Sequence, residues 1–235
     1  MNEWNKIWEK RSSEIVLSED VFDMFQKLKS ADGFDTQNVN GYYEAFYKQW
    51  DKMVNKIVEK AGDFSSVYEV GCGSGVNLYL FHKLKKIQRI GGCDYSKSLI
   101  ELARKVLKMG DLKWQEADKI SKTPVYDVVL ADSVFQYFQE PEYGMRVLEK
   151  MWNKARKIVV ITEIHDEEMK EEHLNYRRKF VKNYDEKYRG LDKTFYKKEM
   201  FQNFAKKVGA SCTIIKPQNE LYWNNKYVFD CYLSR

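Results

Sequence analysis

Short runs of hydrophobic residues alternate along the chain with segments in which hydrophobic residues recur at helical spacing. Five such runs have the length and composition of buried strands: residues 67–70, 88–93, 112–115, 126–130 and 157–162. Two further strand-like runs, at residues 210–216 and 227–233, come near the end of the chain. Because strands that alternate with helices form parallel sheets with helices on both faces, the pattern predicts an α/β fold.

The first sixty residues are helical in pattern and rich in aromatic side chains. Trp4 and Trp8 are spaced to share one helix face, and residues 41–60 form one long amphipathic pattern. Between them, residues 30–38 are dense in turn formers. We therefore expect a helical segment over residues 1–62, followed by a core over residues 63–235.

A charged stretch over residues 166–187 has helical spacing throughout. Its first turn is acidic, with Asp166, Glu167 and Glu168, and its later turns are basic. This order complements the helix dipole, so a solvated helix explains it without a ligand. We expect a helical insertion into the core at about residues 166–195.

Composition limits the classes of protein that the chain can belong to. Its 235 residues can bury one sizeable core, and no apolar run is as long as a membrane span. The first residues lack the apolar centre of a signal peptide, and the four cysteines are scattered, which predicts reduced thiols in the cytoplasm and no bound metal. The net charge of +5 arises from 40 bases among 35 acids, so a mixed solvated surface explains it.

The first predicted strand ends in a glycine-rich turn, in the stretch VYEVGCGSG over residues 67–75. Strand, glycine turn and helix together present backbone N–H groups and a helix N-terminus to a nucleotide. Gly71, Gly73 and Gly75 allow the backbone to approach a ligand closely. A dinucleotide fingerprint would need a further glycine where this chain has Val76.

An acid followed two residues later by a G-x-G-x-G turn resembles motif I of class I S-adenosylmethionine (SAM) dependent methyltransferases. The resemblance implies SAM as the cofactor and S-adenosylhomocysteine (SAH) as the product. It also implies a seven-stranded, mostly parallel Rossmann-like sheet with the last strand inserted antiparallel, and a helical lid over the substrate. The implied cofactor contacts in this stretch are Glu69, Gly71, Gly73 and Gly75.

Asp94 ends the second predicted strand, where an acid can accept hydrogen bonds from both ribose hydroxyls of a nucleoside. Its alternative role is that of a plain turn carboxylate. Tyr95 follows and can lie on the adenine ring. Ser96 is the candidate N-cap of the next helix and lies in the same cofactor-binding segment.

Two more segments at the carboxyl ends of strands are candidate parts of the site. Residues Glu116, Ala117 and Asp118 resemble the segment with which this family contacts adenine. Asp118 fits the family's acid best, and Glu116 is the alternative. The fourth strand ends in ADSVFQYF, which places Asp132 in the ligand crevice.

Other motifs narrow the acceptor. Asn-Pro-Pro-Tyr, which cradles an exocyclic base amine, is absent, and none of the three prolines precedes a cysteine. The W-x-x-x-W-E-K-R opening, G-F-D-T at residues 33–36 and S-V-F-Q-Y-F at residues 133–138 resemble small-molecule methyltransferases of bacterial capsule and surface-polysaccharide gene clusters. The resemblance implies O-methylation of a small polar, anionic metabolite, such as a phosphorylated or nucleotide-linked capsule precursor.

A hydroxyl acceptor would benefit from a general base, by about 10²–10⁴-fold. His165 follows the fifth predicted strand at the rim of the crevice and is the candidate base, with helix capping or turn chemistry as the alternative. Tyr137, Asp132 and Asp35 are candidates for contact with the acceptor.

Arg177 and Arg178 are candidates to bind a phosphate or a carboxylate of the substrate, and a solvated basic face is the alternative. Two other functions stay open. An RNA or protein methyltransferase would call for a basic stripe or an appended module, which is not visible, so a nucleic-acid partner is not expected. A catalytically silent subunit that activates a partner would not need the whole cofactor motif. The oligomeric state is not determined.

Overall fold

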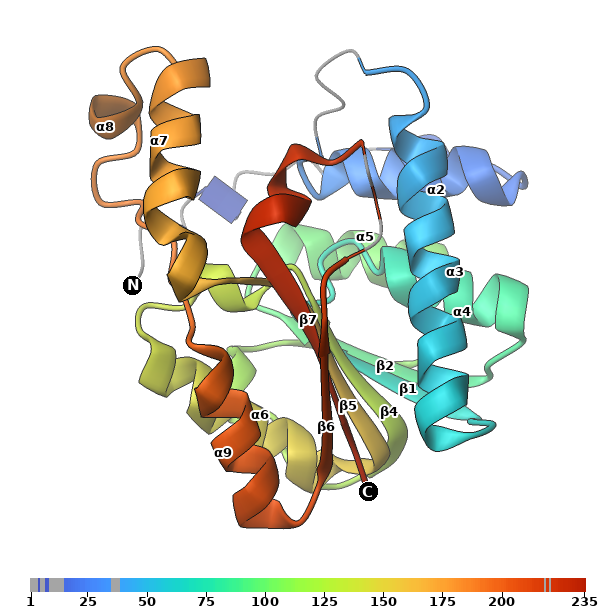
Figure 1. Cartoon of the computed structure of the whole chain (residues 1–235). Helices are drawn as coiled ribbons and strands as arrows, with labels where there is room; N and C mark the ends of the chain where they lie inside the picture. The colour runs from blue at the N-terminus through green and yellow to red at the C-terminus, as the bar shows by residue number, and fades with distance from the viewer. Residues whose placement is uncertain (1–3, 5–6, 9–14, 35–38, 218, 220) are drawn as a thin grey trace.

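A computed structural model of the chain describes residues 4, 7–8, 15–34, 39–217, 219 and 221–235 (Figure 1). Seven strands form one sheet in the order β3-β2-β1-β4-β5-β7-β6. The first five pair in parallel, whereas β7 runs antiparallel to both β5 and β6. The predicted seven-stranded, mostly parallel sheet is therefore confirmed. Its strands are β1 (Ser66–Val70), β2 (Arg89–Asp94), β3 (Asp111–Trp114), β4 (Tyr126–Asp132), β5 (Ala155–His165), β6 (Ser211–Ile215) and β7 (Val228–Ser234).

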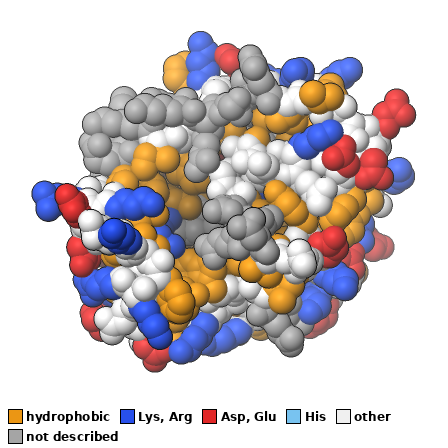
Figure 2. Space-filling view, turned by 90° about the horizontal axis from the view of Figure 1, so that it is seen from above, with side chains coloured by type: hydrophobic (Ala, Val, Ile, Leu, Met, Phe, Trp, Pro, Cys, Tyr) orange, Lys and Arg blue, Asp and Glu red, His pale blue; other side chains and the backbone are white. Residues whose placement is uncertain are grey.

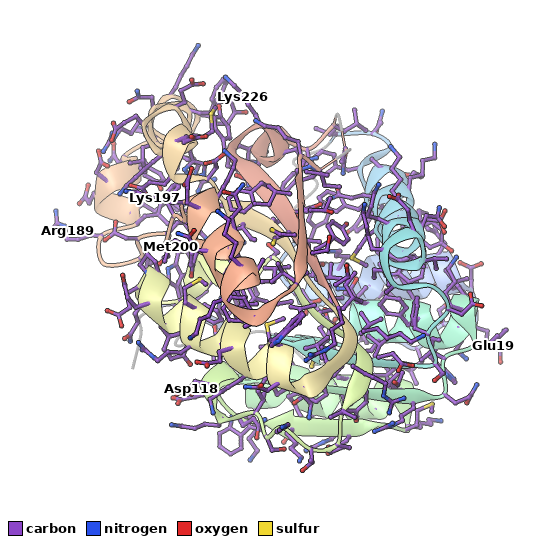
Figure 3. The ribbon with its side chains drawn as sticks, turned by 60° about the horizontal axis from the view of Figure 1, so that its bottom comes forward. Glu19, Asp118, Arg189, Lys197, Met200 and Lys226 are labelled. Carbon is purple, nitrogen blue, oxygen red and sulfur yellow. The ribbon has the colours of Figure 1, made fainter. Side chains whose placement is uncertain are left out.

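Helices cover both faces of the sheet. α6 (Pro141–Lys154) and α9 (Lys198–Val208) lie on one face and come forward in Figure 3, where Met200 marks the start of α9. α3 (Tyr42–Ala61), α4 (Val76–Lys85) and α5 (Lys97–Leu107) lie on the other face. No helix of the described ranges is long and apolar enough to cross a membrane. The other helices are α2 (Val21–Ala31), α7 (Lys170–Phe180) and α8 (Tyr184–Lys187), with short 3-10 turns η1 (Ala117–Lys119), η2 (Phe135–Tyr137), η3 (Glu167–Met169) and η4 (Trp223–Tyr227).

The hydrophobic core consists of two clusters, one on each face of the sheet. Successive strand residues point to opposite faces, so Ile158 and Val160 of β5 lie in the cluster under α3 and α4, whereas Val159 and Ile161 lie under α6 and α9. α2 and α3 belong to the first cluster, and full burial of a side chain such as Leu28 contributes about 1.5–3 kcal/mol. These two helices thus share the core of the sheet, and a lid domain ending at residue 62 stays a prediction.

The charged stretch after β5 differs from its prediction. The single helix expected over residues 166–187 is wrong, because β5 continues to His165 and the chain then forms η3, α7 and α8 as separate elements. Asn183 lies between the two helices with a left-handed φ of 52°, a conformation that stops a helix. Among the described residues of α7, only His173 is buried. The stretch is therefore helical in three separate elements, and its role as an insertion into the core stays a prediction.

Candidate cofactor and acceptor site

A cavity of about 450 Å³ opens at the carboxyl ends of the parallel strands. Its walls come from α2, the glycine turn, the ends of β2, β4 and β5, the turn η2 and the segment before η4. The face of the molecule in Figure 2 is hollowed, and hydrophobic side chains gather around the hollow. Ligands of open α/β sheets bind at this edge, so the cavity is the candidate site.

The glycine turn takes backbone conformations that other residues rarely adopt. Gly71 and Gly73 have φ values of 71° and 49°. A Cβ on Gly71 would lie 2.5 Å from the Val134 side chain, and one on Gly73 would lie 2.5 Å from Asp32 Oδ1. Both glycines line the cavity, whereas Gly75, the third candidate of the turn, does not and instead faces Ala103 of α5. Gly75 is thus placed to let α4 pack closely on α5.

Replacing Gly73 with alanine should weaken SAH binding by at least about ten-fold, or about 1.4 kcal/mol. The added Cβ would displace Asp32 and strain the turn, since a left-handed conformation costs an L-residue about 1–2 kcal/mol. Gly209→Ala is the matched control, because Gly209 also has a positive φ of 70° but nothing lies within 4 Å of its added Cβ. Calorimetric titration of both variants with SAH measures the difference. Equal affinities would contradict this role of the turn.

Asp94 forms part of the cavity wall and is only 8% exposed. Its Oδ2 accepts the backbone N–H of Gly73 at 2.9 Å, and its Oδ1 accepts the backbone N–H of Ser96 at 2.8 Å. Burial raises the pKa of Asp94 to about 6, although these N–H groups oppose the rise. Tyr95 also lines the cavity. Ser96 does not, because it is fully buried and caps α5 by accepting from the Leu99 N–H at 3.4 Å.

Glu69 and Asp132 belong to one buried polar network in the wall. Glu69 Oε1 accepts from Asn77 Nδ2 at 2.6 Å, and the same amide lies 3.0 Å from Asp132 Oδ2. The Thr162 hydroxyl donates to Asp132 Oδ1 at 2.6 Å, and Lys29 Nζ lies 3.8 Å from Asp132 Oδ2. Burial raises the pKa of Glu69 well above its usual value. Glu69 Oε2 is buried and has no hydrogen-bond partner among the described residues.

The two acids after β3 that are candidates for contact with adenine differ in their position relative to the cavity. Glu116 and Ala117 line the cavity, whereas Asp118 does not. Asp118 lies at the edge of the molecule in Figure 3, in the turn η1. The structure thus supports the alternative, Glu116, over the residue that the sequence placed first.

Tyr137 lines the cavity from η2 and is surrounded by other side chains. The Trp4 and Trp8 rings contact it edge-on, with centroids 5.1 Å and 5.3 Å away. Lys193 Nζ lies 3.3 Å from the centre of the Tyr137 ring. Trp4 and Trp8 therefore share a face, as their spacing predicts, and bring the start of the chain to the cavity.

The expected position of His165 at the rim of the crevice is wrong. It is the last residue of β5, is 2% exposed and does not line the cavity. Its ring packs against His173 and Phe195, with centroids 4.8 Å and 5.0 Å away, and lies 3.4 Å from the Asn224 amide. Burial lowers the pKa of His165 well below its usual value. This placement gives no support to a direct role as general base.

The candidates for substrate binding on α7 also lie outside the cavity lining. Arg178 pairs with Asp185, with Nε 3.1 Å from each carboxylate oxygen. The Arg177 guanidinium lies over the rings of Tyr184, Tyr188 and Trp223. Asp35, the third candidate, lies outside the described residues.

Several residues of the cavity wall were not assigned to the site from sequence. Lys29 and Asp32 reach it from α2, and Asn77 from the first turn of α4. Asp32 accepts the N–H and the hydroxyl of Ser74 at 2.7 Å and 2.8 Å, and burial raises the pKa of Asp32 to about 7. Glu163, near the end of β5, is a fourth residue of the cavity wall that was not assigned to the site from sequence. The D-G pair at the end of α2 reads only as a turn, so no signal in the sequence marks Asp32 as a partner of the glycine turn.

Comparison with known proteins places this geometry in a family. Residues 63–224 match the model of a methyltransferase domain. A malonyl-[acyl-carrier protein] O-methyltransferase from Anoxybacillus flavithermus is 23% identical over 123 residues. That match covers 51% of this chain and spans about half, 48%, of the relative.

Solved structures share the fold at low identity. A magnesium protoporphyrin IX methyltransferase from Synechocystis, with bound SAH, has a TM-score of 0.63 at 14% identity over 91% of this chain and 94% of its own. The plantazolicin methyltransferase BpumL with SAH has a TM-score of 0.63 at 17% identity, over 100% of this chain and 99% of its own. An amino pentose methyltransferase from Micromonospora echinaspora with SAM has a TM-score of 0.63 at 11% identity, over 94% of this chain and 99% of its own. Since the family model spans well over half of the chain, the protein belongs to the methyltransferase domain family, which confirms the enzyme class expected from its glycine turn.

Proposed function

We propose that the chain transfers a methyl group from SAM to a small polar molecule that binds beside α2 and α3. The observation that carries the proposal is the order of groups around one cavity. The strand order β3-β2-β1-β4 puts Glu116 and Ala117 after β3 on one side, then Asp94 at the end of β2, then Glu69 and the glycine turn at β1, and Asp132 at the end of β4.

The residues present fit SAM at each of its parts. Glu116 and the backbone of Ala117 would hold the adenine edge, and Asp94 would accept the ribose hydroxyls. The unpartnered Oε2 of Glu69 leaves an acceptor for the ammonium group, and Lys29 supplies a cation for the carboxylate. Gly73 leaves room beside the turn for Asp32, because a Cβ there would lie 2.5 Å from Asp32 Oδ1.

Bound SAM supplies an activated methyl group, so the chain mainly has to hold the acceptor in line and keep water out. Holding reacting atoms about 3–3.5 Å apart contributes at most about 7–11 kcal/mol to lowering the barrier. Phe34, Phe46 and Tyr137 line the cavity with aromatic rings. These rings exclude water around the transferred group, which strengthens the electrostatic interactions inside.

The finer proposal is O-methylation of an anionic acceptor, such as a phosphorylated or nucleotide-linked capsule precursor. It rests on the resemblance of the sequence motifs alone. The wall of a second cavity beside the first carries three lysines (Lys29, Lys52 and Lys56) and three acids (Asp132, Glu163 and Asp230), so its charge favours neither an anionic nor a neutral acceptor. The cytoplasmic location likewise stays a prediction that rests on the scattered cysteines.

Transfer of labelled methyl groups from SAM tests the proposal against its alternatives. We expect label in the small-molecule fraction of a bacterial extract, and none in purified RNA or in the protein fraction. Calorimetry should show binding of SAH and not of NAD. Label found only in RNA or protein would overturn the small-molecule acceptor, and SAH binding without any transfer would favour a silent subunit.

A further inference from the structure

Near its carboxyl end, strand β5 carries one extra residue relative to its partner strand β7. Ile161 pairs with Cys231 and Ile164 with Phe229, so two residues of β5 lie opposite the single residue Asp230 of β7. Glu163 is one of these two and has a φ of 56°, which is disfavoured for any residue with a Cβ. This arrangement is a β-bulge, a feature that re-aims side chains near functional sites.

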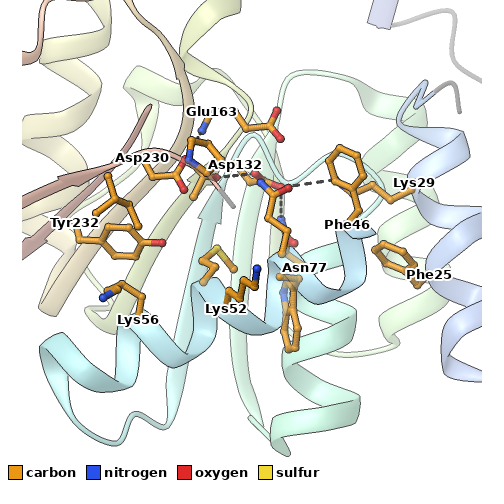
Figure 4. A pocket seen from close by; sticks show the side chains of 16 residues that line it. Phe25, Lys29, Phe46, Lys52, Lys56, Asn77, Asp132, Glu163, Asp230 and Tyr232 are labelled. Atoms are coloured by element: carbon orange, nitrogen blue, oxygen red, sulfur yellow. Dashed lines mark hydrogen bonds and ion pairs between the residues drawn. The ribbon is translucent and has the colours of Figure 1, made fainter. Parts of the chain in front are cut away.

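The bulge turns a carboxylate toward the cavity. Ile161 and Ile164 both belong to the core under α6 and α9, whereas strict alternation would put Glu163 on that face as well. Instead Thr162 and Glu163 both line the second cavity, which lies under α3 and has a volume of about 90 Å³ (Figure 4). Glu163 lines the larger cavity too, so its side chain lies where the two cavities meet.

The surroundings hold this strained residue in place. Its backbone N–H donates to the side chain of Asp230, at 2.9 Å from Oδ1. Glu163 is only 4% exposed, and Asp230 is 5% exposed. Strain of this kind clusters at functional sites, because only a well-determined surrounding maintains it.

Charged side chains of several neighbouring elements face Glu163. Asp132 of β4 and Asp230 of β7 are acidic, Lys29 of α2 and Lys193 before α9 are basic, and the Tyr222 phenol lies in the same wall. Burial, followed by repulsion from Asp132, raises the pKa of Glu163 to about 7, and the two lysines oppose that rise. A carboxyl with such a pKa exchanges a proton near neutral pH.

We propose that Glu163 is the catalytic base that removes the proton from a hydroxyl acceptor lying where the two cavities meet. The proposal rests on the proposed function. The acceptor oxygen forms a bond to the methyl carbon and gives its proton to the Glu163 carboxylate. The carbon–sulfur bond of the donor breaks, and its electron pair stays on sulfur. The acceptor class is thus an alcohol or phenol whose remaining part extends under α3.

An acceptor-free test uses two nucleosides, SAH and its analogue sinefungin, in which a carbon bearing an ammonium group replaces the sulfur. That ammonium group probes the space beside the transferred methyl. Glu163→Gln should weaken sinefungin binding at least about ten-fold at pH 8, as loss of a charge-assisted contact does, and change SAH binding less than about two-fold. For the unmodified chain, the preference for sinefungin over SAH should rise from pH 6 to pH 8, and the variant should lose this rise.

Glu167→Gln is the matched control, because Glu167 lies four residues further along, in η3, and does not line either cavity. It should leave both affinities unchanged. Equal sinefungin binding by Glu163→Gln and the unmodified chain, at both pH values, would overturn the proposal.

Turnover with labelled SAM and a bacterial metabolite extract gives a second readout. Glu163→Gln should lower the rate by about 10²-fold or more and remove the fall in rate below pH 7. A variant that keeps both rate and pH profile would overturn the role of Glu163 while leaving the proposed function intact. Failure of the unmodified chain to bind SAH would instead reject the proposed function itself.

Discussion

Asp94→Ala should weaken binding of SAH by at least about 100-fold, or about 2.8 kcal/mol, while the chain stays folded. Each hydrogen bond from a ligand hydroxyl to a charged carboxylate contributes about 1.5–3 kcal/mol, and Asp94 would accept two such bonds from the ribose. The same carboxylate also holds the N–H groups of Gly73 and Ser96, so the variant loosens the glycine turn as well. Calorimetric titration with SAH measures the affinity, and circular dichroism follows the fold.

Two comparisons separate these contributions. Glu101→Ala removes an exposed acid on α5 whose nearest partner, Lys97, is 4.0 Å away, and it should leave SAH affinity unchanged. Adenosine and SAH carry the same ribose, so Asp94→Ala should weaken both by similar factors. Unchanged SAH affinity in Asp94→Ala would reject the assignment of Asp94 to the ribose.

Glu163→Gln should gain stability over the unmodified, ligand-free chain as the pH rises. The difference in the free energy of unfolding, variant minus unmodified chain, should be up to about 3 kcal/mol larger at pH 8 than at pH 4.5. In the folded chain, burial raises the pKa of Glu163 from 4.5 to about 7. Between these two values the folded state keeps the proton that the unfolded state releases. The stability that this carboxyl contributes is therefore present below pH 4.5 and is lost as the pH rises to about 7. Glutamine does not titrate and escapes this loss.

Urea unfolding of both chains at several pH values between 4.5 and 8 measures the effect, provided that unfolding is two-state. The free-energy difference between variant and unmodified chain should grow with pH and level off above about pH 7. Glu167→Gln, at a partly exposed acid outside both cavities, is the comparison for the loss of an acidic side chain as such. A constant difference for Glu163→Gln would mean that its carboxyl titrates normally, which would contradict its burial in the folded chain.

Local pattern was enough to predict the elements that carry the residues proposed to hold SAM. The N-cap role of Ser96 in α5 is as expected. Gly71, Gly73 and Asp94 line the cavity because glycine turns and strand-end acids act within a few residues of chain. Such features depend on backbone preference and hydrophobic period, which neighbouring residues carry by themselves.

Other features of the site and its surroundings depended on contacts between distant parts of the chain. His165 reads as a loop residue in sequence, but pairing of β5 with β7 extends the strand and buries the ring. Asp32 meets Ser74 only because α2 packs beside the glycine turn. Element boundaries and partners of this kind are set by tertiary packing, which local propensity does not encode.

Glu163 shows most clearly what the sequence by itself determined and what only the tertiary structure decided. The sequence places an acid directly after the fifth predicted strand, residues 157–162, and alternation continued from Val159 and Ile161 would put that acid on the face under α6 and α9. The bulge opposite Asp230 reverses that assignment and turns the acid toward the cavity. A one-residue shift of register moves a side chain to the other face, and the shift is fixed by the partner strand, so the fold alone decides which face carries the carboxylate.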